Sequence, residues 1–286
     1  MNKVGVVTDS TCCLPREVVE QNEIRIVPIY IIYQGHSYHD GVDITPGEVY
    51  KIMRRKKEFP TTSTPSIGDF LEAYSQMSRQ KDKIICITLT GVQSKTYEAA
   101  LLARDKARET LPGINIEVLD SGAVAGALGF IVLEAARKAV QGADLTTVIE
   151  AARNMMGRVN HISMVDSLFY LARTGRVGRA AAWAGTILNM KPVLEHSTAT
   201  GITMPLARPR TRARAVDYML KTMAERVGKS PVHVMVHHAD EPVDGAKLKA
   251  AISSRFSCVE LYLTEFTPGM GIHAGPGILG VSFYTD

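Results

Sequence analysis

The stretch VGVVTDST, residues 4–11, decides the fold of this chain. Its first four residues form a short apolar run rich in valine, which is typical of a buried strand. Thr8, Asp9, Ser10 and Thr11 follow that run directly, so polar side chains stand where the strand ends. The stretch therefore predicts a buried strand with hydroxyl and carboxyl groups at its carboxyl end.

The same pattern returns further along the chain. Strand-like runs alternate with apolar residues at helical spacing, which favours βαβ units and a mainly parallel sheet. The predicted strands are Val4–Val7, Ile24–Tyr33, Ile84–Leu89 and Ile114–Leu119, and the predicted helices are Ile67–Gln80 and Lys95–Leu111.

The second half of the chain is organised differently. Residues 124–158 are rich in alanine and predict two helices separated near Gly142. Strands are then predicted at Pro231–His237, Val259–Phe266 and Gly277–Tyr284, with a helix at Val243–Phe256. We therefore expect a two-domain α/β protein. Its N-terminal domain, residues 1–158, has a mainly parallel sheet flanked by helices, and residues 159–286 form a C-terminal α+β domain.

Composition excludes several classes of function. The chain has 286 residues, and its 33 basic and 29 acidic side chains give a net charge of only +4. With 6% aromatic residues and one tryptophan, it offers little for nucleic acid binding. No apolar segment approaches a membrane span or a signal-peptide core, and the four cysteines lack the spacing of a zinc site. We expect a cytoplasmic protein with free thiols and no bound metal.

Hydroxyl side chains follow three of the predicted strands, and they should meet at one edge of the sheet. Besides residues 8–11, Ser94 ends the segment TGVQS after the third strand, and Ser121 follows the fourth. Each of these two serines could simply cap a helix. Together with helix N-termini, however, they would form a site for an anion, and hydroxyls without lysine suit a carboxylate better than a polyphosphate.

Two further segments bear on this site. PTTSTPS, residues 60–66, holds four hydroxyls between two prolines that restrict its conformation, although it could be only a turn. PGMGIHAGPGILG, residues 268–280, places His273 among glycines that allow close backbone approach, which favours a ligand contact over a structural role. The sequence has no GxxxxGK[ST] loop, no GxGxxG directly after a predicted strand and no GxSxG elbow.

These motifs, in this order, resemble the DegV family. They are TDST, TTSTPS, SKTY, VLDS, YLARTGRVGRAAAWAGTILNMKPVL and HAGPG, and they span nearly the whole chain. The resemblance implies a fatty-acid-binding protein with a tunnel between two α/β domains, in some members the lipid-carrying subunit of a fatty acid kinase. It implies that Thr62, Ser94 and His273 hold the carboxylate, with Ser10, Ser63, Ser121 and Gly275 supporting the pocket.

The chain departs from the family pattern in places. Thr64 stands where Gln is frequent, Lys95 stands where Gly is frequent, and Cys12–Cys13 replaces more polar residues. Lys95 could help to bind the carboxylate or could point to solvent. Arginines at 173, 176, 179 and in RPRTRAR, residues 208–214, are either a solvated face or, by the resemblance, a docking surface for a kinase, with Arg173 and Arg210 as the candidates.

Other clusters favour structural roles. HSYHD (36–40) and VHHAD (236–240) lack a third metal ligand, and Asp9 is expected to orient loops rather than act as a base. The small-residue run AAAWAG (180–185) favours a packed core helix, with Ala182 and Ala184 lining the acyl tunnel as the alternative.

We therefore expect a non-enzymatic carrier of one long-chain fatty acid that uses no cofactor and presents the carboxylate to a separate ATP-binding kinase. Two alternatives stay open. One is an acyl hydrolase with Ser94 as nucleophile and His273 as base, which would need an orienting acid and an oxyanion hole that the sequence does not identify. The other is a lipid buffer without a kinase partner.

Overall fold

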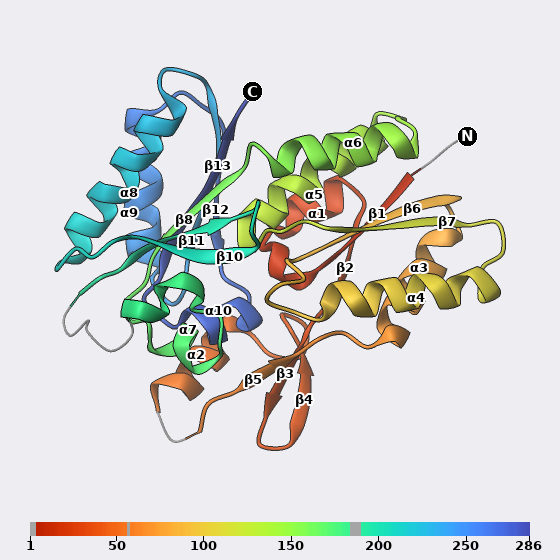
Figure 1. The fold of residues 1–286 in the computed structure, drawn as a ribbon, viewed down its shortest axis with the longest axis horizontal. Helices are drawn as coiled ribbons and strands as arrows, with labels where there is room; N and C mark the ends of the chain where they lie inside the picture. Colours follow the sequence, from red (N-terminus) through yellow and green to blue (C-terminus); the bar gives the residue numbers. More distant parts are fainter. Residues whose placement is uncertain (1–3, 56–57, 184–189) are drawn as a thin grey trace.

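The computed structural model describes residues 4–55, 58–183 and 190–286. Two larger sheets stand side by side, and a small three-stranded sheet lies below them in Figure 1. The first sheet has the order β2-β1-β6-β7 and is parallel throughout. Its strands are β1 (Val4–Asp9), β2 (Ile24–Val27), β6 (Lys83–Thr88) and β7 (Asn115–Asp120).

Helices bury both faces of this parallel sheet, as the valine and isoleucine runs require. Successive side chains of a strand point to opposite faces. Val7, Ile84 and Cys86 accordingly pack in the cluster that contains α3 and α4, whereas Ile85 and Ile87 pack in the cluster that contains α5 and α6. The helices of this half are α1 (Arg16–Gln21), α3 (Ile67–Ser78), α4 (Thr96–Thr110), α5 (Ala125–Val140) and α6 (Leu145–Met156).

The second sheet is mixed, with the order β10-β9-β8-β13-β11-β12. Its neighbours pair antiparallel except for β11 and β12, which are parallel. Helices α8 (Arg212–Val227) and α9 (Pro242–Arg255) lie along one face, on the left in Figure 1. The strands are β8 (Asn160–Met164), β9 (Val193–Ser197), β10 (Ile202–Ala207), β11 (Val232–His238), β12 (Cys258–Glu265) and β13 (Leu279–Thr285).

Helix α5 lies between the two larger sheets (Figure 1). Its apolar residues share one core with strand β1 and with Met235 and Tyr284 of the second sheet. Residues 125–133 of α5 are all buried, which is expected for a helix covered on all sides. The second sheet thus turns one face to α8 and α9 and the other to α5 and the first half of the chain.

The expectation of one strand over Ile24–Tyr33 was wrong. The segment forms two strands of different sheets, because Pro28 separates β2 from β3 (Tyr30–Tyr33) and cannot donate a hydrogen bond to a ladder. Strand β3 is the centre of the three-stranded sheet β4-β3-β5, whose other strands are β4 (His36–His39) and β5 (Thr61–Ser63).

The α/β fold class is confirmed, with a parallel sheet flanked by helices followed by a mixed sheet. The domain boundary near residue 158 stays a prediction. The parallel sheet draws on residues up to Asp120 and the mixed sheet begins at Asn160, with α5 and α6 between them. The remaining elements are α2 (Pro46–Arg54), α7 (Phe169–Arg173), α10 (Pro268–Ala274) and the 3₁₀ segments η1 (Ser10–Cys12) and η2 (Gly178–Trp183).

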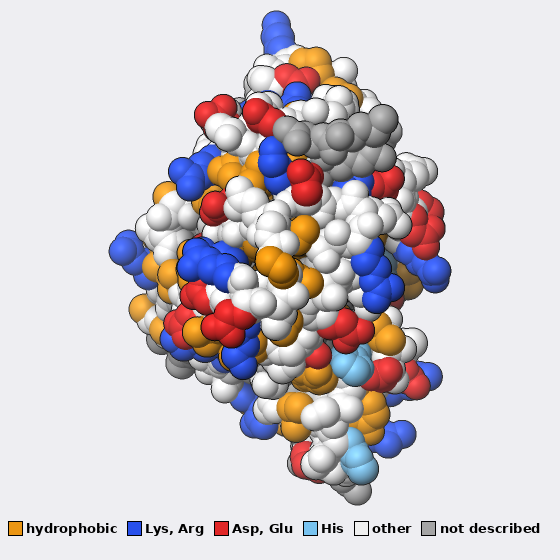
Figure 2. All heavy atoms as spheres, turned by 90° about the vertical axis from the view of Figure 1, so that its right-hand side faces the viewer, with side chains coloured by type: hydrophobic (Ala, Val, Ile, Leu, Met, Phe, Trp, Pro, Cys, Tyr) orange, Lys and Arg blue, Asp and Glu red, His pale blue; other side chains and the backbone are white. Residues whose placement is uncertain are grey.

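The surface carries charges of both signs. Figure 2 shows basic and acidic side chains interspersed on the face formed by the first half of the chain, in keeping with the small net charge. Within the described ranges, no helix has the length and apolar character needed to cross a membrane. All four cysteines are free, and three of them are buried: Cys12, Cys13 and Cys86.

Candidate functional site

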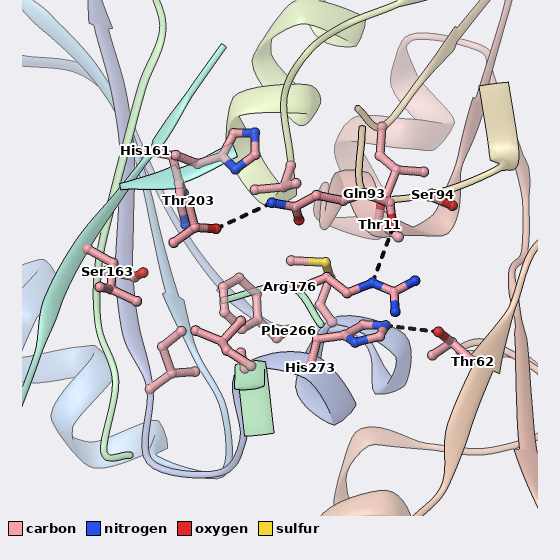
Figure 3. Close-up of a pocket in the computed structure, with 18 of the residues that line it drawn as sticks. Thr11, Thr62, Gln93, Ser94, His161, Ser163, Arg176, Thr203, Phe266 and His273 are labelled. Atoms are coloured by element: carbon pink, nitrogen blue, oxygen red, sulfur yellow. Dashed lines mark hydrogen bonds between the residues drawn. The ribbon is translucent and has the colours of Figure 1, made fainter. Parts of the chain in front are cut away.

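A cavity of about 330 Å³ lies between the carboxyl edge of the parallel sheet and the face of the mixed sheet that carries no helix α8 or α9 (Figure 3). One wall comes from the loops after β1 and β6, from β5 and from the residue before α5. The opposite wall comes from β8, β9 and β10. Helix α10 and the loop after α7 close the remaining side. The topological switch of an open parallel sheet is where such a site is expected.

Asp9 draws two of the loops together. Its buried carboxylate accepts hydrogen bonds from Leu89 N at 2.8 Å and from Thr11 N at 3.0 Å. Leu89 and Thr11 both line the cavity. Burial raises the pKa of Asp9 to about 6, against the opposing effect of these donors. Asp9 therefore orients loops, as the sequence predicted, and does not face the cavity.

Thr62 and His273 form the central polar pair of the site. Thr62 Oγ1 lies 2.8 Å from His273 Nε2, although 211 residues separate them. Thr62 is held by the pairing of β5 with β3, opposite Ile31, and His273 occupies the last turn of α10. Burial, aided by the charge of Arg176, lowers the pKa of His273 to about 4. The ring is therefore neutral near pH 7.

Ser94 lies on the same wall and also lines the cavity. Its hydroxyl is 2.8 Å from Thr96 Oγ1 and accepts a hydrogen bond from Thr96 N at 3.3 Å. Lys95, not Ser94, is the N-cap residue of α4. The Lys95 ammonium pairs with Glu98 at 2.5 Å on the exposed surface. The Lys95 ammonium therefore lies against α4, where the Glu98 carboxylate balances its charge.

Arg176 is the site residue that sequence reasoning missed. It follows α7, lines the cavity and donates from Nε to the carbonyl oxygen of Gln93 at 3.2 Å. Figure 3 shows its guanidinium beside His273, on the side of Ser94. Its sequence neighbours Arg173 and Arg179 are exposed, and no local pattern separates the inward arginine from the outward ones.

The predicted supporting residues occupy different positions. Ser63 lines the cavity, whereas Ser10, Ser121 and Gly275 are outside its lining. Ser10 donates to Asp40 at 2.6 Å and accepts from Ile29 N at 3.2 Å. It therefore helps to position Ile29, which lines the cavity. Ser121 is buried and accepts from Ala123 N at 3.0 Å, which shapes the turn before α5.

Gly275 ends helix α10 with a positive φ of 83°. A Cβ atom at this position would lie 2.1 Å from Tyr170 Cδ2 on α7. Glycine is thus required both by the backbone conformation and by the close approach of α10 to α7. Because His273 precedes this turn by two residues, Gly275 sets the position of the helix end that carries it.

We expect Gly275→Ala to lower the free energy of unfolding by roughly 2–4 kcal/mol, since strained backbone and overpacking act together. Gly142 has a similar φ of 88° but no neighbour within 4 Å of its Cβ position, so Gly142→Ala is a matched control for the backbone term alone. Chemical denaturation of both variants measures the difference. Equal losses would show that contact with Tyr170 is unimportant.

Among the described residues, Ser94 and His273 do not form the hydrogen-bonded catalytic arrangement of a serine hydrolase. Ser94 bonds Thr96, and His273 bonds Thr62. Among the described residues, His273 Nδ1 has no hydrogen-bond partner, so no acid orients the ring. The same part of the chain contains no group of three metal-ligating side chains, and His39 and His237 instead bond Asp43 and Thr264.

The remaining candidates lie away from the cavity. Arg173 and Arg210 are both exposed, and the Arg173 guanidinium stacks over Phe59 with 4.6 Å to the ring centroid. Ala182 is exposed in η2 and does not line the cavity, contrary to the tunnel hypothesis. Ala184, the other residue of that hypothesis, lies outside the described residues.

Fold and site together define an α/β protein with a cavity that gathers hydroxyl, imidazole and guanidinium groups beside apolar side chains. The sequence model of the DegV family, described as a family of uncharacterised proteins, matches residues 3–286. The chain therefore belongs to the DegV family. A DegV domain-containing protein of Caldanaerobacter subterraneus subsp. tengcongensis is 34% identical over 99% of both chains.

Two solved structures extend the comparison. A fatty-acid-binding DegV family protein from Thermus thermophilus has a TM-score of 0.90 and 30% identity, covering 99% of this chain and 100% of its own. A stearic acid-binding protein from Eubacterium ventriosum has a TM-score of 0.90 and 26% identity, covering 100% and 98% of the two chains.

Proposed function

We propose that this protein binds one long-chain fatty acid in the cavity, with the carboxylate at Thr62, Ser94, His273 and Arg176. The observation that carries the proposal is the Thr62–His273 pair at 2.8 Å beside Arg176, in a cavity that is also lined by several apolar side chains. The fatty-acid-binding relatives with the same fold support it.

The neutral state of His273 decides how the head group is held. With its proton on Nε2, His273 donates to Thr62 Oγ1, and the Thr62 hydroxyl proton is free to donate to a carboxylate oxygen. Ser94 supplies a second hydroxyl donor, and Arg176 supplies the positive charge. Each charge-assisted hydrogen bond contributes about 1.5–3 kcal/mol. The head group is thus oriented by four groups from β5, α4, α7 and α10 regions.

The acyl chain supplies most of the affinity. Leu89, Val165, Leu171, Phe266 and Ile278 are apolar side chains of the cavity wall. Burial of each methylene against such side chains contributes about 0.8 kcal/mol. A long chain therefore gains more from its tail than from its carboxylate, and the carboxylate sets its direction.

We further propose that the protein is a carrier without a cofactor, which presents the carboxylate to a separate ATP-binding kinase. The absence of a phosphate-binding loop motif in the sequence supports a division of labour in which the partner brings the nucleotide. Arg173 and Arg210 are exposed and available for docking. Kinase turnover that survives charge reversal at both positions would exclude this docking surface.

Native mass spectrometry of the purified protein, followed by denaturing lipid extraction, tests the binding proposal. We expect an added mass present in one copy per chain that extracts as a fatty acid. A protein that emerges empty, and stays empty with oleate or palmitate, would contradict fatty acid binding and would direct the search to another carboxylate.

A further inference from the structure

The wall of the cavity that faces Thr62 and Ser94 is polar, which a plain hydrocarbon tail does not need. His161 and Ser163 on β8, His196 on β9 and Thr203 on β10 all line it. Figure 3 shows His161, Ser163 and Thr203 across the cavity from Thr62 and Ser94. Alternation along β8 places His161 and Ser163 on the cavity face and Ile162 and Met164 in the core under α8.

Several polar atoms of this wall have no hydrogen-bond partner among the described residues. His196 Nδ1 is buried with no hydrogen bond among the described residues. The structure gives Ser163 Oγ no bond to any described residue, and His161 uses only Nδ1, which is 2.8 Å from Ser282 Oγ. All three side chains are at least nine-tenths buried. Buried polar groups without partners are uncommon and call for a ligand or water.

The two histidines of the wall are uncharged near pH 7. Burial lowers the pKa of His161 to about 3 and that of His196 to about 4. Glu195 of β9 also lines the cavity, and its carboxylate accepts from Arg226 on α8 at 2.5 Å. A second carboxylate would therefore find no cation here, whereas an uncharged oxygen would find hydrogen-bonding groups.

The tautomer of His196 indicates which uncharged group of a ligand could bind here. Its Nε2 lies 2.9 Å from the carbonyl oxygen of Gly122, which can only accept, so Nε2 carries the proton. Nδ1 of the neutral ring is then an acceptor without a donor. A ligand hydroxyl can donate to such a nitrogen and accept from the Ser163 hydroxyl, whereas a ketone can only accept.

We propose that the preferred ligand is a hydroxylated fatty acid, whose chain hydroxyl is bound by His161, Ser163 and His196. This inference rests on the proposed fatty acid function and names the class of acyl chain. The carboxylate of the fatty acid occupies the Thr62 side of the cavity. Its chain hydroxyl supplies the hydrogen-bond partner that the polar atoms of the β8–β9 wall lack.

The test is a competition among matched acids on delipidated protein. The panel contains stearate, hydroxystearates with the hydroxyl at successive positions along the chain, the matching ketostearates and a dicarboxylic acid of equal length. We expect one hydroxystearate to bind roughly 10-fold tighter than stearate, since a hydrogen bond that satisfies buried groups is worth about that factor. The ketone should bind less tightly than the matching hydroxystearate, because it cannot donate to His196 Nδ1, and the dicarboxylic acid should bind no better than stearate.

Variants locate the effect. In His161→Leu and His196→Leu the wall becomes apolar, and we expect the preference to reverse toward stearate. His36→Leu, on the exposed strand β4, is the histidine control and should keep the preference. If the wild type binds stearate as tightly as every hydroxystearate, the inference is wrong and the proposed function stands. If no acid of the panel binds, both are wrong.

Discussion

Replacing Thr62 with valine will weaken fatty acid binding about 10- to 100-fold, the loss expected for one charge-assisted hydrogen bond. Valine keeps the shape and the strand propensity of threonine, so β5 should stay paired with β3. The variant removes the hydroxyl that faces the carboxylate. It also removes the partner of His273 Nε2 and so leaves both nitrogens of a buried imidazole unbonded.

Calorimetry on delipidated protein measures this loss, and two controls make it specific. Thr61 is the exposed neighbour of Thr62 on β5 and is not among the cavity-lining residues, so Thr61→Val should bind like the wild type. A fatty alcohol of equal length lacks the carboxylate and should lose little affinity in Thr62→Val. Unchanged affinity of Thr62→Val for the acid would place the head group elsewhere in the cavity.

Stability of the ligand-free protein should fall steeply on acidification, because its buried histidines resist protonation. Burial lowers the pKa of His161 to about 3 and the pKa values of His196 and His273 to about 4. In the unfolded chain the same rings take up protons near pH 6.5. Their contribution to stability is therefore complete above that pH and is lost as the pH falls toward the folded pKa values.

Carboxyl groups act in the opposite direction, because desolvation raises the pKa values of Asp9, Asp40 and Glu265. Burial raises the pKa of Asp9 to about 6, so its contribution to stability is complete below its unfolded pKa and is lost as the pH rises through the folded pKa of about 6. At about pH 5, each of His161, His196 and His273 lowers the free energy of unfolding by about 2 kcal/mol relative to neutral pH. The change at Asp9 raises it by about 1.4 kcal/mol over the same range. From these four groups we expect the free energy of unfolding to fall by roughly 4–5 kcal/mol between about pH 7.5 and about pH 5. The lowered pKa of His237 adds to this fall, and the raised pKa values of Asp40 and Glu265 reduce it.

Urea denaturation at the two pH values measures this effect. His161→Leu should flatten the pH profile, because it removes one of the linked histidines. His36→Leu, at an exposed position of β4, is the control for the loss of a histidine that is not buried. A free energy of unfolding that is equal at both pH values would mean that these rings gain protons in the folded protein without cost.

Much of the fold could be predicted from local patterns. The valine run of residues 4–7, the isoleucine runs of β6 and β7, and the helical spacing in α3 and α4 each fix an element within a residue or two of its observed ends. Apolar periodicity is a local property, so it needs no knowledge of the rest of the chain. Pro28 was also visible in the sequence, and its consequence for the strand over residues 24–33 was missed.

The residues proposed to hold the carboxylate depended on a different kind of information. Thr62, Ser94 and His273 were predicted from the order of motifs, and the structure brings all three to one cavity. Their pairing across 211 residues could not be read from spacing, because it arises when α10 packs against β5. Glycines 269 and 271 allow that packing, since a Cβ at either would lie within 2.6 Å of Ile29 or Tyr50.

The sequence by itself determined the period of each element, the polar ends of the parallel strands and the membership of the family. Only the tertiary structure decided which side chains face the cavity. Arg176 points inward and Arg173 outward, and His161 and Ser163 line the cavity while Ile162 faces α8. The physical reason is that the direction of a side chain depends on the residues that pack against it, and those residues come from distant parts of the chain.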